Sequence, residues 1–189
     1  RIQGPDGEAT VLGIKATTDV KDCGHCDLFV IATKASAVGA AARAIKPYVD
    51  VNTVVLTIQN GLGAGDRIAT HLATANVMLG VADGFGASMK GPGHVHHNAM
   101  KLIRLGEMSG GRSDRLEELE GIWQGAGFNA RAFEDIHQLI WEKLLCNVTL
   151  SAPCSVFECN VGELRNSDEH WMIALGCMQE AYKCGLAQG

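Results

Sequence analysis

Residues 27–33, Asp-Leu-Phe-Val-Ile-Ala-Thr, form an uninterrupted apolar run. A run of this length without polar alternation is typical of a strand that is buried on both faces, and we expect a central parallel strand here. Residues 36–48 are Ala-rich, begin with Ser and have a Pro near their end, which predicts a helix. Residues 53–59, Thr-Val-Val-Leu-Thr-Ile-Gln, are a second β-branched run. A strand, a helix and a strand within about 30 residues predict a βαβ unit.

The segments on either side extend this α/β pattern. Further strands are predicted at residues 8–18, 77–82, 95–105 and 128–133. Ser113 precedes a helix with apolar residues at spacings of three and four, and after residue 134 the pattern becomes helical throughout. We therefore predict an α/β fold, with a partial doubly wound (Rossmann-like) sheet in residues 1–133 and an all-helical second domain in residues 134–189.

The composition argues against several classes of protein. Of the 189 residues, 47% are hydrophobic and 20% are charged, so the chain has a core and is not disordered. The formal charge is -5 and the basic residues are scattered, so we expect no nucleic-acid partner. Charged residues interrupt every long apolar stretch, so we expect no membrane-spanning segment.

The cysteines and the first residues bear on location and completeness. Seven cysteines are an odd number in a chain of this size, which favours reduced thiols and a cytoplasmic protein over a disulfide scaffold. The chain opens Arg-Ile-Gln-Gly, with neither an initiator Met nor a signal peptide. We interpret it as an internal fragment.

Two clusters of potential ligands have simpler interpretations. Cys23-Gly-His-Cys26 has the spacing of thiol–disulfide exchange enzymes, but there the pair begins a helix, whereas here it precedes a strand. A redox or zinc role is therefore disfavoured, and a thiol oxidoreductase acting through Cys23 and Cys26 is a minor alternative. His94 and His96 share one face of a predicted strand, for which an exposed polar face is a better explanation than a metal site. We expect no metal.

Two polar residues follow the predicted parallel strands directly. Lys34 comes after the strand at 27–33, and Asn60 comes after the strand at 53–59. Ligands of open parallel sheets bind beyond the carboxyl ends of the strands, so a cation and an amide there could bind an anionic cofactor that carries ribose. Exposed loop residues of these types are also common by chance. The glycine turn at 61–65 is not the dinucleotide fingerprint, because Asp66 replaces its third glycine and repels phosphate.

Lys143, Asn147 and Ser151 are spaced four residues apart, which places them on one side of a helix. Desolvation of a lysine among apolar residues disfavours its charged form, which can bring its pKa close to the working pH of a general acid. The spacing alone still favours an ordinary lysine that extends along a core helix. Pro153 predicts that the helix kinks or stops near Ser151.

Four segments, in chain order, resemble the ketopantoate reductase family. They are Asp27-Leu-Phe-Val-Ile-Ala-Thr-Lys34-Ala, Ile58-Gln-Asn60-Gly-Leu-Gly, Ile140-Trp-Glu-Lys143-Leu-Leu-Cys-Asn147 and Gly162-Glu-Leu-Arg165. Gly86-Ala87 and Gly91-Pro92-Gly93 also match, between the second and the third segment. The likeness runs through nearly the whole chain.

The resemblance implies a nucleotide-binding domain followed by a helical substrate domain. It implies NADPH-dependent reduction of a 2-oxo acid, by default 2-dehydropantoate to pantoate in pantothenate biosynthesis. The implied roles are proton donation by Lys143, substrate binding by Asn60, Asn147 and Ser151, and cofactor binding by Lys34, Asn60 and Ala87. It leaves a homodimer open.

This chain departs from the family pattern at two substrate positions. Ser151 stands where the family has a second asparagine, and Val161 stands where an asparagine precedes Gly162. A pocket built to pair polar groups discriminates strongly, so the substrate could be a different 2-oxo acid. A second alternative is a catalytically impaired nucleotide-binding or interaction module. The residues that separate NADP from NAD follow the second strand of such a domain and are not in this chain.

Overall fold

The computed structural model describes residues 1–4, 7–99 and 101–188. The chain divides into two compact units. The first comprises Arg1–Gln59 and Gly63–Ile136, and the second comprises Asn60–Leu62 and His137–Gly189. The turn at Asn60–Leu62 thus belongs to the second unit, although the residues before and after it in the sequence belong to the first.

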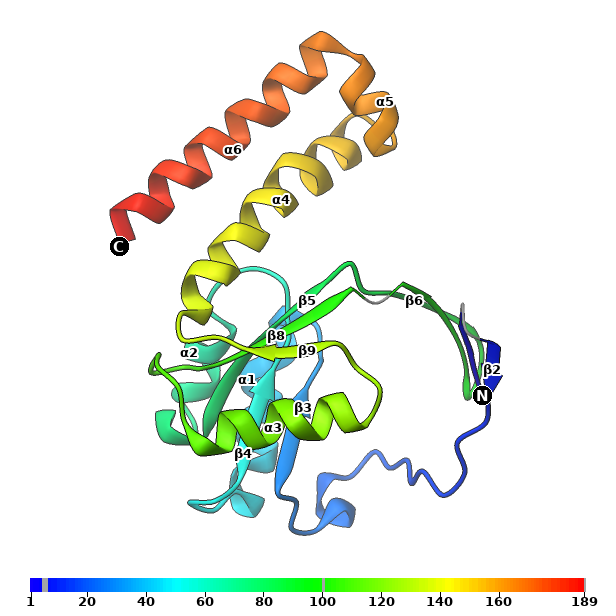
Figure 1. The fold of residues 1–189 in the computed structure, drawn as a ribbon, viewed down its shortest axis with the longest axis vertical. Coiled ribbons are helices and arrows are strands. Elements are labelled where there is room, and N and C mark those ends of the chain that lie inside the picture. Colours follow the sequence, from blue (N-terminus) through cyan, green and yellow to red (C-terminus); the bar gives the residue numbers. More distant parts are fainter. Residues whose placement is uncertain (5–6, 100, 189) are drawn as a thin grey trace. The chain divides into compact units, whose positions relative to one another are not determined.

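A five-stranded sheet forms the centre of the first unit (Figure 1). Its strands, in spatial order, are β3 (Leu28–Ile31), β4 (Val54–Thr57), β5 (Val77–Asp83), β8 (Leu102–Glu107) and β9 (Ala130–Ala132). The pairs β3–β4, β4–β5 and β8–β9 are parallel, whereas β5–β8 is antiparallel. The predicted βαβ unit and the Rossmann-like α/β class are confirmed.

The predicted central position of β3 is wrong for the part of the chain that the structure describes. β3 lies at an edge of the sheet and pairs only with β4 there. Val30 is accordingly 42% exposed. An apolar run indicates that a strand is covered, but it does not say how many strands flank it.

Four strands form a separate sheet in the order β2 (Gly7–Ala9), β1 (Ile2–Gly4), β7 (His94–Ala99) and β6 (Gly86–Gly91). The strand predicted at residues 8–18 is largely wrong, since pairing ends at Ala9 and residues 10–18 are exposed without a partner strand. The single strand predicted around 95–105 is two strands, β7 and β8, in different sheets. Residue 100, which falls within that range, lies outside the described residues.

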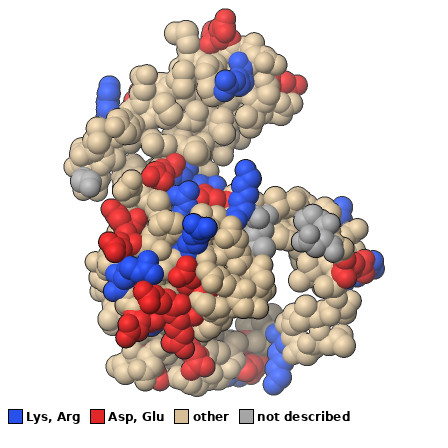
Figure 2. All heavy atoms as spheres, in the orientation of Figure 1, with Lys and Arg blue, Asp and Glu red and all other residues tan. Residues whose placement is uncertain are grey.

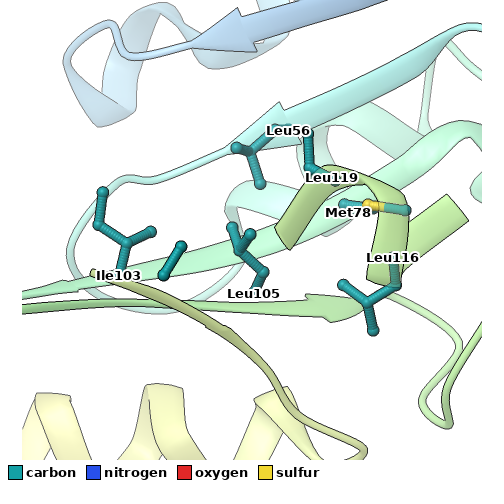
Figure 3. Packing of buried hydrophobic residues seen from close by; sticks show 7 residues of the cluster. Leu56, Met78, Ile103, Leu105, Leu116 and Leu119 are labelled. Atoms are coloured by element: carbon teal, nitrogen blue, oxygen red, sulfur yellow. The ribbon is translucent and has the colours of Figure 1, made fainter. Parts of the chain in front are cut away.

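Helices cover both faces of the five-stranded sheet. The helix α3 (Asp114–Gly125) lies on one face, and α1 (Val38–Ile45) and α2 (Ala64–Ala69) lie on the other (Figure 1). The Ser113 side chain caps α3 by accepting a hydrogen bond from the Leu116 backbone N–H at 3.2 Å. The core under α3 consists of buried side chains from the helix and from four strands (Figure 3): Leu56, Met78, Ile103, Leu105, Leu116, Leu119 and Ala130.

The second unit is helical, as predicted. It contains α4 (Ile136–Val156, of which all but the first residue belong here), α5 (Val161–Asn166) and α6 (Asp168–Gln188). The helix α6 returns alongside α4, and a Cβ atom on Gly185 would lie 3.2 Å from the Trp141 ring (Figure 1). None of the helices among the described residues combines the length and the apolar character needed to cross a bilayer.

The helix α4 does not stop near Ser151, because it continues through Pro153 to Val156. Proline removes one backbone hydrogen bond of the helix. The ring of Pro153 is buried and lies one turn before the helix end, so the turns that carry Ser151 remain helical.

Candidate functional site

The carboxyl ends of β3 and β4 are joined by the side chain of Gln59. Its Nε2 donates hydrogen bonds to the carbonyl oxygens of Ile31 at 2.7 Å and Thr33 at 3.1 Å. Its Oε1 accepts from the Thr57 hydroxyl. The same amide thus ties together the two strand ends that precede Lys34 and Asn60. The sequence analysis missed this residue, although an amide between a buried strand and a glycine turn was a visible signal.

Lys34 follows β3, but Ala32 and Thr33 separate it from the strand, which ends at Ile31 and not at Thr33 as predicted. Its backbone is extended, with φ -61° and ψ 150°, and it precedes a single 3-10 turn at Ala35–Ala37. The Ala37 backbone N–H donates to the Lys34 carbonyl at 2.9 Å. The turn holds the Lys34 backbone while its side chain remains exposed.

Ala87 lies on β6, where it pairs with His97. It therefore belongs to the four-stranded sheet, whereas Lys34 follows a strand of the five-stranded sheet. Its side chain is exposed. The cofactor-binding role of Ala87 stays a prediction.

Asn60 and Asn147, two of the predicted substrate-binding residues, meet within the second unit. The Asn147 Nδ2 atom lies 3.5 Å from the Asn60 Oδ1 atom, at the outer limit of a hydrogen bond, although 87 positions separate the two in sequence. Gly61 and Gly63 have φ values of 87° and 79°, in the left-handed region that glycine adopts without strain. These glycines form the tight turn that carries Asn60 to α4.

The helix α4 presents Lys143, Asn147 and Ser151 on one side, because the helix is continuous over all three. Lys143 and Asn147 are half-buried, whereas Ser151 is exposed. The Ser151 carbonyl accepts a hydrogen bond from the Ser155 hydroxyl at 2.8 Å. An ammonium group one turn from a pair of amides is suited to a substrate that carries a polarised carbonyl or a carboxylate.

The structure agrees with the expectation for the Cys23–Cys26 pair and differs from it for His94 and His96. Cys26 lies beside its own turn, with its sulfur 3.8 Å from the Cys23 carbonyl oxygen, and β3 follows, as expected. His94 and His96 do not form the expected exposed face. Both are half-buried, and among the described residues His94 Nε2 and His96 Nδ1 have no hydrogen-bond partner. The described residues contain no cluster of three or more His, Cys, Asp or Glu placed to hold a metal.

A buried carboxylate connects β8 with the start of α3. Glu107 accepts hydrogen bonds from the Ser113 hydroxyl at 2.5 Å and from Arg115 Nε at 2.8 Å, and it forms an ion pair with the same guanidinium. Burial alone would raise the pKa of Glu107, but the hydrogen bonds from Arg115 and Ser113 outweigh it and hold the pKa below its usual range. This cluster stabilises the fold of the first unit.

Acidic side chains gather over α3 on the face shown in Figure 2. This helix carries the exposed carboxylates of Asp114, Glu117 and Glu118. Such a face repels a phosphate backbone and does not suit nucleic acid.

The partial doubly wound sheet, together with the helical unit that α4 begins, makes this a Rossmann-type α/β protein with a helical second unit. Its family follows from the match of residues 1–110 to the family model "Ketopantoate reductase PanE/ApbA" and of residues 135–189 to the C-terminal model of the same family. The chain belongs to the ketopantoate reductase family.

Individual relatives agree with this assignment. A 2-dehydropantoate 2-reductase of Streptococcus pyogenes is 27% identical over 188 residues, which cover 100% of this chain and 60% of the relative. The chain thus spans about 60% of the length of such curated relatives. The crystal structure of 2-dehydropantoate 2-reductase from Geobacter metallireducens is 29% identical, with a TM-score of 0.92, over 100% of this chain and 62% of that one.

One structural neighbour has a different name. D-mandelate dehydrogenase, in a ternary structure with NADH and anilino(oxo)acetate, is 24% identical with a TM-score of 0.80. The match covers 87% of this chain and 53% of that chain. At this identity, the likeness shows a shared fold.

Proposed function

We propose that this protein catalyses the NADPH-dependent reduction of a 2-oxo acid, with 2-dehydropantoate as the default substrate. Membership of the ketopantoate reductase family supports the reaction class. The observation that carries the assignment of residues is the contact between Asn60 and Asn147, one helical turn from Lys143 on the same side of α4.

In this proposal Lys143 is the proton donor to the substrate carbonyl. NADPH, when bound, supplies the hydride, and the carbonyl oxygen then develops alkoxide charge. The Lys143 ammonium stabilises that charge and then neutralises it by transferring a proton to the oxygen. Arginine is a poor replacement, because the guanidinium keeps its proton.

The remaining site residues bind and orient the two ligands. Asn60 and Asn147 donate hydrogen bonds to the substrate, and Ser151 extends the same side of α4 with a hydroxyl. Lys34, Asn60 and Ala87 contribute to cofactor binding. The exposed ammonium of Lys34 beyond β3 fits the negative charge of a nucleotide phosphate. Gln59 holds the strand ends on which Lys34 and Asn60 depend.

The first test is NADPH oxidation by the full-length protein with 2-dehydropantoate. We expect Lys143→Ala to lower kcat by about 10²- to 10⁴-fold, the usual contribution of a positioned acid. Lys143→Arg keeps the charge and is expected to retain binding while losing turnover. Lys183→Ala, at an exposed position of α6, is the matched control and should leave kcat unchanged. An unchanged kcat in Lys143→Ala would show that another group donates the proton.

Ser151 and Val161 bear on which 2-oxo acid is reduced. Ser151 is exposed on α4, and Val161 is the first residue of α5 and is 50% exposed. The neighbour with anilino(oxo)acetate supports including an aryl 2-oxo acid beside 2-dehydropantoate and a straight-chain 2-oxo acid, each with NADPH and NADH. If the two departures set specificity, Ser151→Asn with Val161→Asn should raise kcat/KM for 2-dehydropantoate relative to the other acids.

The same two residues also motivate a catalytically impaired nucleotide-binding module. That alternative predicts NADPH binding, measured by quenching of tryptophan fluorescence, without turnover of any acid in the panel. Turnover that depends on Lys143 would exclude it.

A further inference from the structure

The corner at which α4 ends has the geometry of a Schellman helix cap. The Cys159 backbone N–H donates to the Cys154 carbonyl at 3.0 Å, two residues before the helix ends at Val156. Glu158, between them, has φ 51°, in the left-handed region that usually holds glycine. A hydrogen bond from the sixth residue back to the first and a left-handed residue before the donor are two features of this motif.

The Schellman cap brings the side chains of its first and sixth residues together, and in most proteins that contact is hydrophobic. Here both residues are cysteines. The Cys154 and Cys159 side chains are both half-buried, and neither is in a disulfide. Burial, the Cys154 thiol and the Glu163 carboxylate together raise the pKa of the Cys159 thiol.

The surrounding corner is held by contacts on both sides of the pair. Phe157 stacks on His170 of α6, with ring centroids 3.9 Å apart and planes within 3°. Asn160 and Glu163 cap α5 reciprocally: the Asn160 N–H donates to the Glu163 carboxylate at 2.8 Å, and the Glu163 N–H donates to Asn160 Oδ1 at 3.0 Å. The two cysteines therefore lie in a defined corner of the fold.

We propose that Cys154 and Cys159 are a reversible dithiol–disulfide pair that exchanges with low-molecular-weight disulfides such as glutathione disulfide. One protein thiolate attacks the glutathione disulfide, forms a mixed disulfide and releases one glutathione thiolate. The second protein thiolate attacks the mixed disulfide, closes the Cys154–Cys159 bond and releases the second. The protein loses two protons and two electrons, and the glutathione disulfide takes them up and becomes two glutathione thiols.

The backbone geometry is compatible with ring closure. A disulfide bridges α-carbons about 4.4–6.8 Å apart. The backbone hydrogen bond between Cys154 and Cys159 holds their α-carbons close together. The other pair near in sequence, Cys23 and Cys26, differs, because the Cys26 sulfur lies against a carbonyl oxygen.

Glu158 makes a direct test possible, because a glutamate-specific protease cleaves between the two cysteines. The full protein is incubated with glutathione disulfide, its remaining thiols are alkylated, and it is digested and analysed by mass spectrometry. We expect residues 143–158 and 159–163 to remain joined and to separate after reduction. Two separate peptides, each alkylated or each carrying glutathione, would overturn the proposal. This test uses the unsubstituted protein, so it does not depend on whether any variant folds.

Variants identify the sulfur atoms of the linkage. Residues 143–158 also contain Cys146, an exposed thiol on α4, so Cys146→Ser is the matched control and should keep the linked peptide. Cys154→Ser and Cys159→Ser should each abolish it. A linkage that survives in Cys154→Ser but disappears in Cys146→Ser would assign the disulfide to another pair and contradict the proposal.

Discussion

Gln59 uses both ends of its amide to hold the ends of two parallel strands. Its nitrogen donates to the carbonyls of Ile31, the last residue of β3, and of Thr33 beyond it, and its oxygen accepts from Thr57 at the end of β4. The polar groups that remain at the ends of strands must find partners, and a side-chain amide supplies both a donor and an acceptor. At the residue scale, the predicted site thus depends on Gln59, which takes no part in the proposed reaction.

Gln59→Glu tests this role. The substitution keeps the shape of the side chain but places a carboxylate oxygen against the carbonyls of Ile31 and Thr33. We expect the free energy of unfolding to fall by about 1–3 kcal/mol, the cost of leaving such groups unpaired. Urea denaturation measures it, and Gln179→Glu, at an exposed position of α6, should change it by less than about 0.5 kcal/mol. Equal stability of the two variants would mean that the Gln59 amide does not hold the strand ends.

At the scale of elements, a glycine on β8 permits the close approach of Ile136, the last residue of the first unit. A Cβ atom on Gly106 would lie 2.4 Å from the Cβ of Ile136, the first residue of α4. Ile136 is fully buried. Because Ile136 Cβ is attached directly to the backbone, relief of this clash requires the backbone at Ile136 or Gly106 to shift.

Gly106→Ala is therefore expected to lower the free energy of unfolding by about 1–3 kcal/mol, as overpacking does. Gly121→Ala on α3 is the matched control, because no heavy atom lies within 4 Å of its added Cβ. There, alanine should raise the free energy of unfolding by about 0.5–1 kcal/mol through helix propensity. Thermal and urea unfolding would show changes of opposite sign, and changes of the same sign would disprove the packing argument.

At the scale of the whole molecule, ionised carboxylates favour the folded state at neutral pH. The pKa of the buried Glu107 is lowered overall, and those of Asp19 and Asp50 are lowered by hydrogen bonds, chiefly from Lys21 and from the Asn52 backbone. A lowered pKa in the folded state stabilises the protein above the unfolded value, and that stability is lost as pH falls through the folded value.

We therefore expect the midpoint of urea unfolding to fall as the pH is lowered below about 4, the ordinary range of carboxyl groups. Glu107→Gln removes the titrating group that Arg115 and Ser113 stabilise. It should lower the free energy of unfolding at neutral pH. It should also make the loss of that free energy toward acid pH smaller, and the loss that remains is due to the exposed carboxylates. An identical slope in wild type and Glu107→Gln would show that Glu107 does not contribute.

Local patterns predicted much of the fold. The apolar runs at 27–33 and 53–59 correctly predicted β3 and β4, because a buried strand needs continuous apolar character wherever it is placed. The spacing of Lys143, Asn147 and Ser151 correctly predicted one side of α4, because helical periodicity is local. The family resemblance is likewise carried by short segments of sequence, and it is confirmed.

The sequence by itself determined which segments become strands or helices and to which family the chain belongs. Only the tertiary structure decided that β3 lies at an edge of the described sheet, that β7 and β8 belong to different sheets, and that Asn60 contacts Asn147. The backbone hydrogen bond from Cys159 to Cys154 likewise depends on a left-handed Glu158. The physical reason is that the periodicity of apolar side chains indicates which face of a segment is buried. Which segment packs against that face depends on packing between parts of the chain that are distant in sequence.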